Sequence, residues 1–338
     1  MKALRSTAVC CCLLATSMLV QAQSPLRVKL ATFVPATSLW GKNLNQMKAE
    51  WTRDTGGRVV LTIFPGGSQG DDVRVMQKMR LGALQAAALS TGLSSVDDAF
   101  NVFSIPFFFE SYDELAYVLD ELTPELERRL ETKGFILLNW GYGGWAHVFT
   151  TEHVTTVEDL KKARIFTAMG DDRMAQLYKA NGFEPQALAP TDIPTGLKTG
   201  MIEALPTTPL AALSFQWYSD IPFMMDVALA PVLGATVITQ RAWRGISEAD
   251  RAAMLDSAKQ LERRLLTAVP EQDGDAVEQM RARALTVVEV DASGPAWQVL
   301  ASSFAESMRG TMVPPDILDM ATRARDAFRA SHSASGGQ

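Results

Sequence analysis

TVEDLKKARIFT (residues 156–167) and GMIEALPTTP (residues 200–209) are the two segments that decide the fold. Thr156 with Asp159 predicts a capped turn, and Arg164 to Thr167 predicts a short strand after it. Between the two segments, residues 171–181 carry apolar side chains on one helical face and end at Asn-Gly, which favours a left-handed helix cap. Strand followed by helix in this order indicates an open α/β sheet.

The preceding part of the chain repeats this alternation. Residues 26–30 alternate as a strand, residues 39–51 have helical spacing, and residues 59–64 form a second strand that stops at Pro65. A glycine-rich turn over 66–70 then leads into another helix. These patterns predict one β-α-β-α unit of an α/β sheet.

The middle of the chain contains a predicted hinge. Residues 135–140 predict a buried strand, and GYGGW (141–145) follows directly. Residues 235–239 predict a strand that returns to the first lobe. A long helix starts at Ser247 and is expected to bend or end at Pro270.

Length and these crossings set the domain organisation. A single core stops growing near ~250 to 300 residues, so a chain of 338 predicts two lobes. We expect lobe one over residues 26–146 and 236–284, lobe two over 147–235 and 285–330, and a disordered polar tail over 331–338.

The N-terminus has the pattern of a secretory signal peptide. Lys2 and Arg5 precede an apolar run, and Val20-Gln21-Ala22 is a small-residue exit, so residues 1–22 are predicted to be removed by cleavage after Ala22. All 3 cysteines lie in this segment, so no disulfide or cysteine metal site is expected. The remaining 30 basic and 38 acidic side chains form no like-charged run, and neither nucleic acid nor an anionic membrane is indicated as a partner.

Several segments in order resemble one known family. TGGRVVLTIFPGGSQG (55–70), RLGAL (80–84), SIPFFF (104–109), TVEDLKKARI (156–165) and LKTGMIE (197–203) are similar to the DctP-type solute-binding proteins of TRAP transporters. The resemblance implies a periplasmic binding protein-like α/β fold with two lobes, a hinge and a long bracing helix. It also implies no cofactor, and delivery of a small ligand to a permease with small and large membrane subunits.

The resemblance places the usual ligand anchor at Phe166. In this family an arginine at that position pairs with a ligand carboxylate, for which a planar guanidinium is suited. A second arginine after the hinge corresponds here to residues 145–147, and an asparagine corresponds to Thr207. A shift of the anchor to Arg164 or His147 remains open, but a combined loss of anchors is the favoured interpretation.

This interpretation predicts a mainly apolar or aromatic ligand, because a buried carboxylate without a partner would be costly. A C4-dicarboxylate or sialic acid is therefore not expected. The resemblance then points to a branch with apolar clefts that works with a tetratricopeptide-repeat protein. An aromatic residue on a strand is usually a core residue, but we expect a ligand-binding role for Phe33, Trp40, Ser68, Gln69, Trp145, Phe166, Thr167, Met169, Thr207, Trp217 and Phe223.

The main alternative from another class is a secreted serine hydrolase. Residues 66–70 read Gly-Gly-Ser-Gln-Gly, which fits the G-x-S-x-G nucleophile elbow with Ser68 as nucleophile. Pro65 loosens the sharp turn that an elbow needs, and the histidines available as base are His147, His153 and His332, the last in the predicted tail. A non-transport sensory binding protein with the same fold is a further alternative, and a binding protein without catalytic residues is the preferred prediction.

Overall fold

The computed structural model describes residues 24–89, 92–169 and 171–333. The predicted signal peptide and its cleavage site, and the last five residues of the predicted tail, lie outside these ranges. Within them no helix is both long and apolar enough to cross a membrane.

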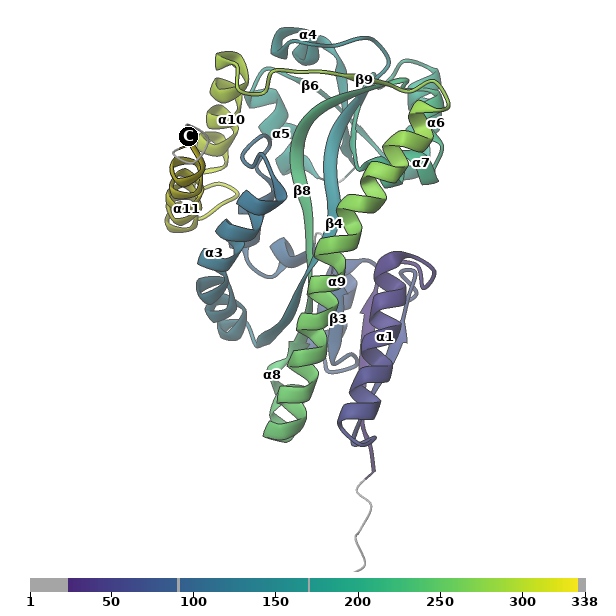
Figure 1. The fold of residues 1–338 in the computed structure, drawn as a ribbon, viewed down its shortest axis with the longest axis vertical. Helices are drawn as coiled ribbons and strands as arrows, with labels where there is room; N and C mark the ends of the chain where they lie inside the picture. Colours follow the sequence, from purple (N-terminus) through teal and green to yellow (C-terminus); the bar gives the residue numbers. More distant parts are fainter. Residues whose placement is uncertain (1–23, 90–91, 170, 334–338) are drawn as a thin grey trace, which may run out of the picture.

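The described residues form a mixed nine-stranded sheet with helices around it (Figure 1). Its order is β2-β1-β3-β8-β4-β7-β5-β6, and β9 pairs with β8. β1 is parallel to β2 and β3, and β5 is parallel to β6 and β7, whereas β4 and β8 are antiparallel to their neighbours apart from β9. The strands are β1 (Leu26–Thr32), β2 (Val59–Phe64), β3 (Ala86–Leu89), β4 (Phe135–Thr150), β5 (Arg164–Ala168), β6 (Glu184–Leu188), β7 (Ala204–Thr207), β8 (Phe223–Thr239) and β9 (Thr286–Val288).

This topology confirms the predicted α/β fold with two lobes. The β1 to β3 side of the sheet belongs to one lobe and the β5 to β7 side to the other, and Figure 1 shows β4 and β8 running between them. The exact lobe boundaries proposed from the sequence remain a prediction, because β4 and β8 pair without interruption of the sheet.

The two crossing strands are much longer than the sequence predicted. β4 continues through the glycine-rich segment to Thr150, and β8 begins at Phe223 instead of Ala235. Tyr142 faces Leu233 while Trp145 faces Pro231, so one extra residue bulges from β4 at this point. Gly144 has φ +101° in the bulge, a conformation that other residues rarely adopt. The predicted hinge is therefore a bulge within a strand.

The helices follow their capping signals. Ser38, Asp71, Ser111, Thr156, Asp171, Thr208, Thr239 and Ser247 each accept a backbone N–H as N-cap. The α-helices are α1 (Leu39–Asp54), α2 (Asp72–Arg80), α3 (Tyr112–Thr132), α4 (Val157–Lys162), α5 (Asp172–Ala180), α6 (Ile193–Lys198), α7 (Pro209–Ser214), α8 (Gln240–Arg244), α9 (Glu248–Arg281), α10 (Pro295–Met308) and α11 (Pro315–Ser333). Shorter 3-10 helices are η1 (Gly92–Ser95), η2 (Asp98–Ser104), η3 (Pro190–Asp192) and η4 (Trp217–Ser219).

Helix α9 is the bracing helix, and it passes Pro270 without ending. Of the two outcomes expected at Pro270, an end of the helix was wrong, because α9 is continuous over 34 residues and contains Pro270 in its interior, and a bend stays a prediction. The helix packs on β4, α1 and α7, and Figure 1 shows it crossing the whole height of the sheet. These contacts offset the one backbone hydrogen bond that proline removes.

Helices α10 and α11 follow β9 and complete the described part of the chain. α11 packs on α3, where Arg329 Nε donates to Glu114 Oε1 at 2.5 Å and Glu114 is almost fully buried. The predicted disordered tail began too early, since α11 includes residues 331–333 and His332 packs against Phe328.

Candidate functional site

A cavity of about 260 Å³ lies between the two ends of the sheet. Its walls come from η1, η2 and the loop after it, from the middle of β4 and β8, and from β5, α5 and β7. Both lobes therefore contribute side chains to it. The lining residues are Leu93, Ser94, Phe100, Phe103, Ser104, Pro106, Trp140, Ala146, Phe166, Thr167, Ala168, Met174, Tyr178, Pro206, Leu229, Ala230, Pro231, Val232 and Leu233.

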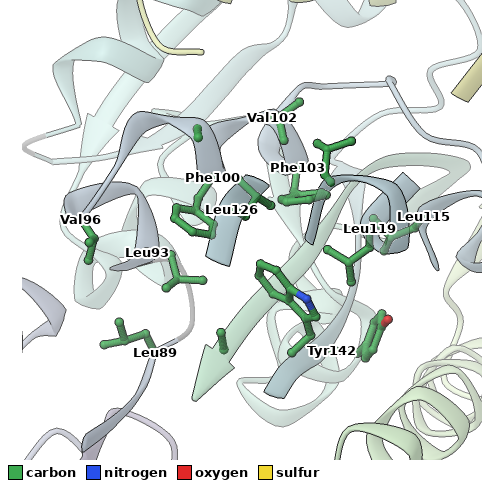
Figure 2. Packing of buried hydrophobic residues seen from close by; sticks show 14 of the residues in the cluster. Leu89, Leu93, Val96, Phe100, Val102, Phe103, Leu115, Leu119, Leu126 and Tyr142 are labelled. Carbon is green, nitrogen blue, oxygen red and sulfur yellow. The ribbon is translucent and has the colours of Figure 1, made fainter. Parts of the chain in front are cut away.

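The apolar wall of this cavity is built by the segment after β3. Asp97 caps η2, and the helix turns Phe100 and Phe103 inward, where each packs against Trp140 with ring centroids 6.1 and 6.0 Å apart. Figure 2 shows Leu93, Phe100 and Phe103 among the buried apolar side chains of this region. The wall is part of the main core, so its shape is fixed by packing.

The opposite wall is the carboxyl end of β5, where Phe166 and Thr167 line the cavity. Phe166 is half-buried and also packs against the core cluster of the second lobe. The Thr167 hydroxyl is buried and has no hydrogen-bond partner within the described residues. An unpaired buried hydroxyl is unfavourable, so a polar ligand group that reaches it would satisfy it. Burial also raises the pKa of Tyr178, which keeps that phenol neutral.

None of the lining residues listed above is charged, and the two candidate replacement anchors point elsewhere. Arg164 forms an ion pair with Glu203, and its Nε donates to the Gly200 carbonyl at 2.8 Å. His147 Nδ1 lies 3.1 Å from the Met225 carbonyl oxygen, and burial lowers the pKa of His147, so the imidazole is neutral near pH 7. Neither side chain supplies a cation to the cavity.

A second cavity of about 220 Å³ lies on the α9 side of β4. It shares only Val232 with the first cavity. The lining residues are Thr32, Phe33, Val34, Ser38, Leu39, Trp40, Ala88, Tyr142, Gly143, Leu210, Val232, Gly234, Val269, Gln272 and Asp273. Trp40 is fixed by its indole N–H, which donates to the Tyr142 carbonyl at 2.7 Å.

Asp273 is the charged member of this second cavity. Its Oδ2 accepts the Trp145 backbone N–H at 3.1 Å, and its carboxylate also accepts the N–H of Leu210. Burial raises the pKa of Asp273 to about 6, although these two backbone donors act in the opposite direction. The described residues provide no salt bridge to this carboxylate.

The residues predicted to bind ligand are therefore divided among several places. Phe166 and Thr167 line the first cavity, and Phe33 and Trp40 line the second. The other predicted residues line neither cavity: Ser68, Gln69, Trp145, Met169, Thr207, Trp217 and Phe223.

Each of these other side chains has its own surroundings. Trp145 is buried with its ring 5.1 Å from that of Tyr112, and Trp217 stacks on Phe215 at 4.8 Å. Gln69 Oε1 accepts from Lys78 Nζ at 3.0 Å. Phe223 contacts the His153 ring, Thr207 pairs with β4, and Ser68 and Met169 are exposed. Their role in ligand binding stays a prediction.

Sequence reasoning missed several cavity residues, among them Phe100, Phe103, Trp140 and Tyr178. Trp140 ends a strand that was assigned to the core, and Tyr178 belongs to a helical stripe assigned to the core. Both are in fact buried, so the core assignment is correct but incomplete. No sequence signal distinguishes a core side chain that also borders a cavity.

The hydrolase alternative finds no support in the geometry. Among the described residues no histidine hydrogen-bonds Ser68: His147 contacts Met225, and His153 and His332 pack against phenylalanine rings. No group of three or more His, Cys, Asp or Glu residues in the described ranges could hold a metal ion. A sheet shared by two lobes, with a cavity between them that no charged side chain of the described residues lines, is the architecture expected of a solute-binding protein.

Comparison with known proteins agrees with this class. A structure of a TRAP periplasmic solute-binding protein from Ochrobactrum anthropi, with its C-terminus bound in the ligand-binding pocket, superposes with a TM-score of 0.85 at 18% identity, covering 93% of this chain and 98% of that one. A TRAP solute-binding protein from Chromohalobacter salexigens with bound D-glucuronate gives 0.77 at 22% identity, covering 89% and 99%.

Curated relatives match over part of their length. A solute-binding protein of Chromohalobacter salexigens is 26% identical over 65% of this chain and 66% of its own. The C4-dicarboxylate-binding periplasmic protein DctP of Rhodobacter capsulatus is 24% identical over 66% and 67%. The model of the bacterial extracellular solute-binding protein family 7, DctP, matches residues 30–302.

The chain belongs to this DctP family. It is a TRAP-type periplasmic solute-binding protein, and its family and structural neighbours are binding proteins, not enzymes. TRAP solute-binding proteins bind small ligands and deliver them to membrane permease subunits.

Proposed function

We propose that this protein binds a small ligand with a largely apolar or aromatic body in the first cavity. The observation that carries the proposal is the absence of charge among the described lining residues, which include Phe166. The family resemblance predicts an arginine at the position of Phe166. A carboxylate enclosed there would lose its hydration without gaining a cation. Aromatic rings and a few hydroxyls are suited instead to an apolar body with one or two polar groups.

Thr167 and Tyr178 give the ligand its polar contacts in this proposal. The Thr167 hydroxyl lacks a protein partner, so a donor or acceptor on the ligand would satisfy it. The ligand is then delivered to a TRAP permease with small and large membrane subunits. A tetratricopeptide-repeat protein is the further partner that an apolar cleft would imply.

The structural and curated neighbours offer the competing ligand class. The solved Chromohalobacter salexigens structure holds bound D-glucuronate, and the Rhodobacter capsulatus relative is a C4-dicarboxylate-binding protein. The two ligand classes, uncharged and acidic, can be compared by thermal shift of protein that has been freed of copurifying molecules. The uncharged probes are 3-phenylpropanol and octanol, and the acidic probes are glucuronate and succinate. Stronger stabilisation by either acid than by every uncharged probe would refute the proposal.

Phe166→Arg sharpens this test. The exchange removes an aromatic contact and adds a cation, so the affinity for uncharged probes is expected to fall roughly 10- to 150-fold, the equivalent of ~1.5 to 3 kcal/mol for one buried aromatic side chain. Succinate should then stabilise the variant more than the parent protein. Phe215→Arg is the matched control, because Phe215 is exposed and lines neither cavity. An unchanged ligand preference in Phe166→Arg would contradict the assignment of Phe166 to the site.

A further inference from the structure

The second cavity combines aromatic walls with one carboxylate. Phe33, Trp40 and Tyr142 come from the loop after β1, from α1 and from β4, and Asp273 comes from α9. Val269 and Asp273 are one helical turn apart, so both face the same side of α9. The other described lining residues are mostly aliphatic, and among all of those described Asp273 is the charged one.

The negative charge of Asp273 has no cation to balance it in the described ranges. Two backbone N–H groups, of Trp145 and Leu210, donate to the carboxylate and fix its position. The Asp273 charge also acts on Tyr112 of α3, because burial and, after it, this negative charge raise the pKa of Tyr112. A fixed carboxylate that borders an apolar cavity attracts a positive group placed in that cavity.

We propose that the second cavity is a binding site for an organic ammonium group, held by the Asp273 carboxylate and by the aromatic rings of Phe33, Trp40 and Tyr142. An ammonium ion donates to the carboxylate in a charge-assisted hydrogen bond. Aromatic rings attract cations through their quadrupole, and this attraction strengthens where water is excluded. An amine on an apolar or aromatic body of modest size satisfies both kinds of wall.

This site is additional to the proposed function. Among the residues that the structure describes, Val232 is the one that lines both cavities, and the residue that tests the first cavity, Phe166, does not line the second. Binding of an amine in the second cavity therefore neither requires nor excludes an uncharged ligand in the first.

Isothermal titration with phenethylammonium and with its neutral counterpart 2-phenylethanol tests the inference on the full mature protein. Because the alcohol can also bind in the first cavity, the comparison is made between proteins: we expect Asp273→Asn to weaken amine binding at least about tenfold and to leave alcohol binding unchanged. Asp275→Asn is the control, because Asp275 is exposed on the same helix and lies outside the cavity lining. It should bind the amine as the parent protein does.

Gln272→Lys provides a variant that keeps Asp273 and its backbone contacts. Gln272 also lines the cavity, so the new ammonium group would pair with Asp273 and compete with the probe. The amine affinity is expected to fall at least about tenfold. Lowering the pH from about 7.5 to 5 should weaken amine binding to the parent protein by roughly tenfold, since a carboxyl with a pKa of about 6 is then mostly protonated.

Two results would overturn the inference: no amine binding to the parent protein, or an amine affinity that is unchanged in Asp273→Asn. Either result leaves the ligand proposed for the first cavity unaffected. Conversely, a Phe166→Arg variant with an unaltered ligand preference would reject that proposal while the amine site stands.

Discussion

The raised pKa of Asp273 predicts a specific pH dependence of stability. The folded protein holds this proton with a pKa of about 6, against the usual 3.8 of an aspartate in an unfolded chain. The folded state therefore binds more protons between these two values, and the free energy of unfolding gains a contribution as the pH falls from about 7 towards 4. Above about pH 7 both states are deprotonated and this contribution is absent.

The size of the effect follows from the two pKa values. Between about pH 7.5 and pH 4.5, protonation of Asp273 should add ~2 kcal/mol to the free energy of unfolding of the parent protein. Asp273→Asn cannot titrate and lacks this contribution. The difference in unfolding free energy between parent and variant should thus change by ~2 kcal/mol across this pH range, while contributions of other carboxylates cancel.

Urea denaturation followed by circular dichroism at both pH values measures this difference. Asp275→Asn, from an exposed position on the same helix, should show a difference from the parent that is nearly independent of pH. A change below about 0.5 kcal/mol for Asp273→Asn would refute the reasoning, because the carboxyl would then titrate alike in both states.

Two further predictions concern the hinge and the C-terminal helix. Gly144→Ala should destabilise the fold by more than the ~1 to 2 kcal/mol that a left-handed backbone alone costs, because the new Cβ would lie 2.5 Å from Asp273 Oδ2. Gly57→Ala is the control: Gly57 also has a positive φ but has open space around it, so this variant measures the backbone cost alone. Arg329→Met should cost ~3 to 5 kcal/mol by leaving buried Glu114 unpaired, with exposed Arg323→Met as control. Equal costs within either pair, in urea denaturation, would contradict the respective assignment.

Local patterns predicted the elements that depend on neighbouring residues. The capping signal of Thr156 and Asp159 starts α4 as predicted, with Thr156 Oγ1 accepting the Asp159 N–H at 3.1 Å. The Thr156 hydroxyl also donates to Asp159 Oδ2 at 2.7 Å. Such contacts span four residues, so a single sequence contains the information needed to predict them.

The long crossing strands depended on distant partners. Pro231 and Gly234 lie within β8, and both residues usually weaken a strand. Pairing with β3 on one side and β4 on the other overrides that local preference. Sequence patterns detect the apolar residues of such a strand but not the partners that extend it.

Only part of the candidate site could be predicted. Phe166 was found through a family position, whereas Phe100 and Phe103 reach the same cavity from residues more than sixty positions earlier. Asp273 had no signal at all, because an acid on a long helix is ordinarily a solvated residue. Its burial arises from the packing of α9 against β4 and α7.

The position of β8 between β3 and β4 also constrains how the chain can acquire its structure. β8 ends at Thr239, and its residues pair with residues that lie 73 or more positions earlier in β4 and 146 or more positions earlier in β3. Until residues 223–239 arrive, the sheet is two separate pieces with unpaired edges at β3 and β4. Folding of both lobes is thus tied to a late segment, which favours a chain that stays unfolded during export and assembles its sheet only afterwards.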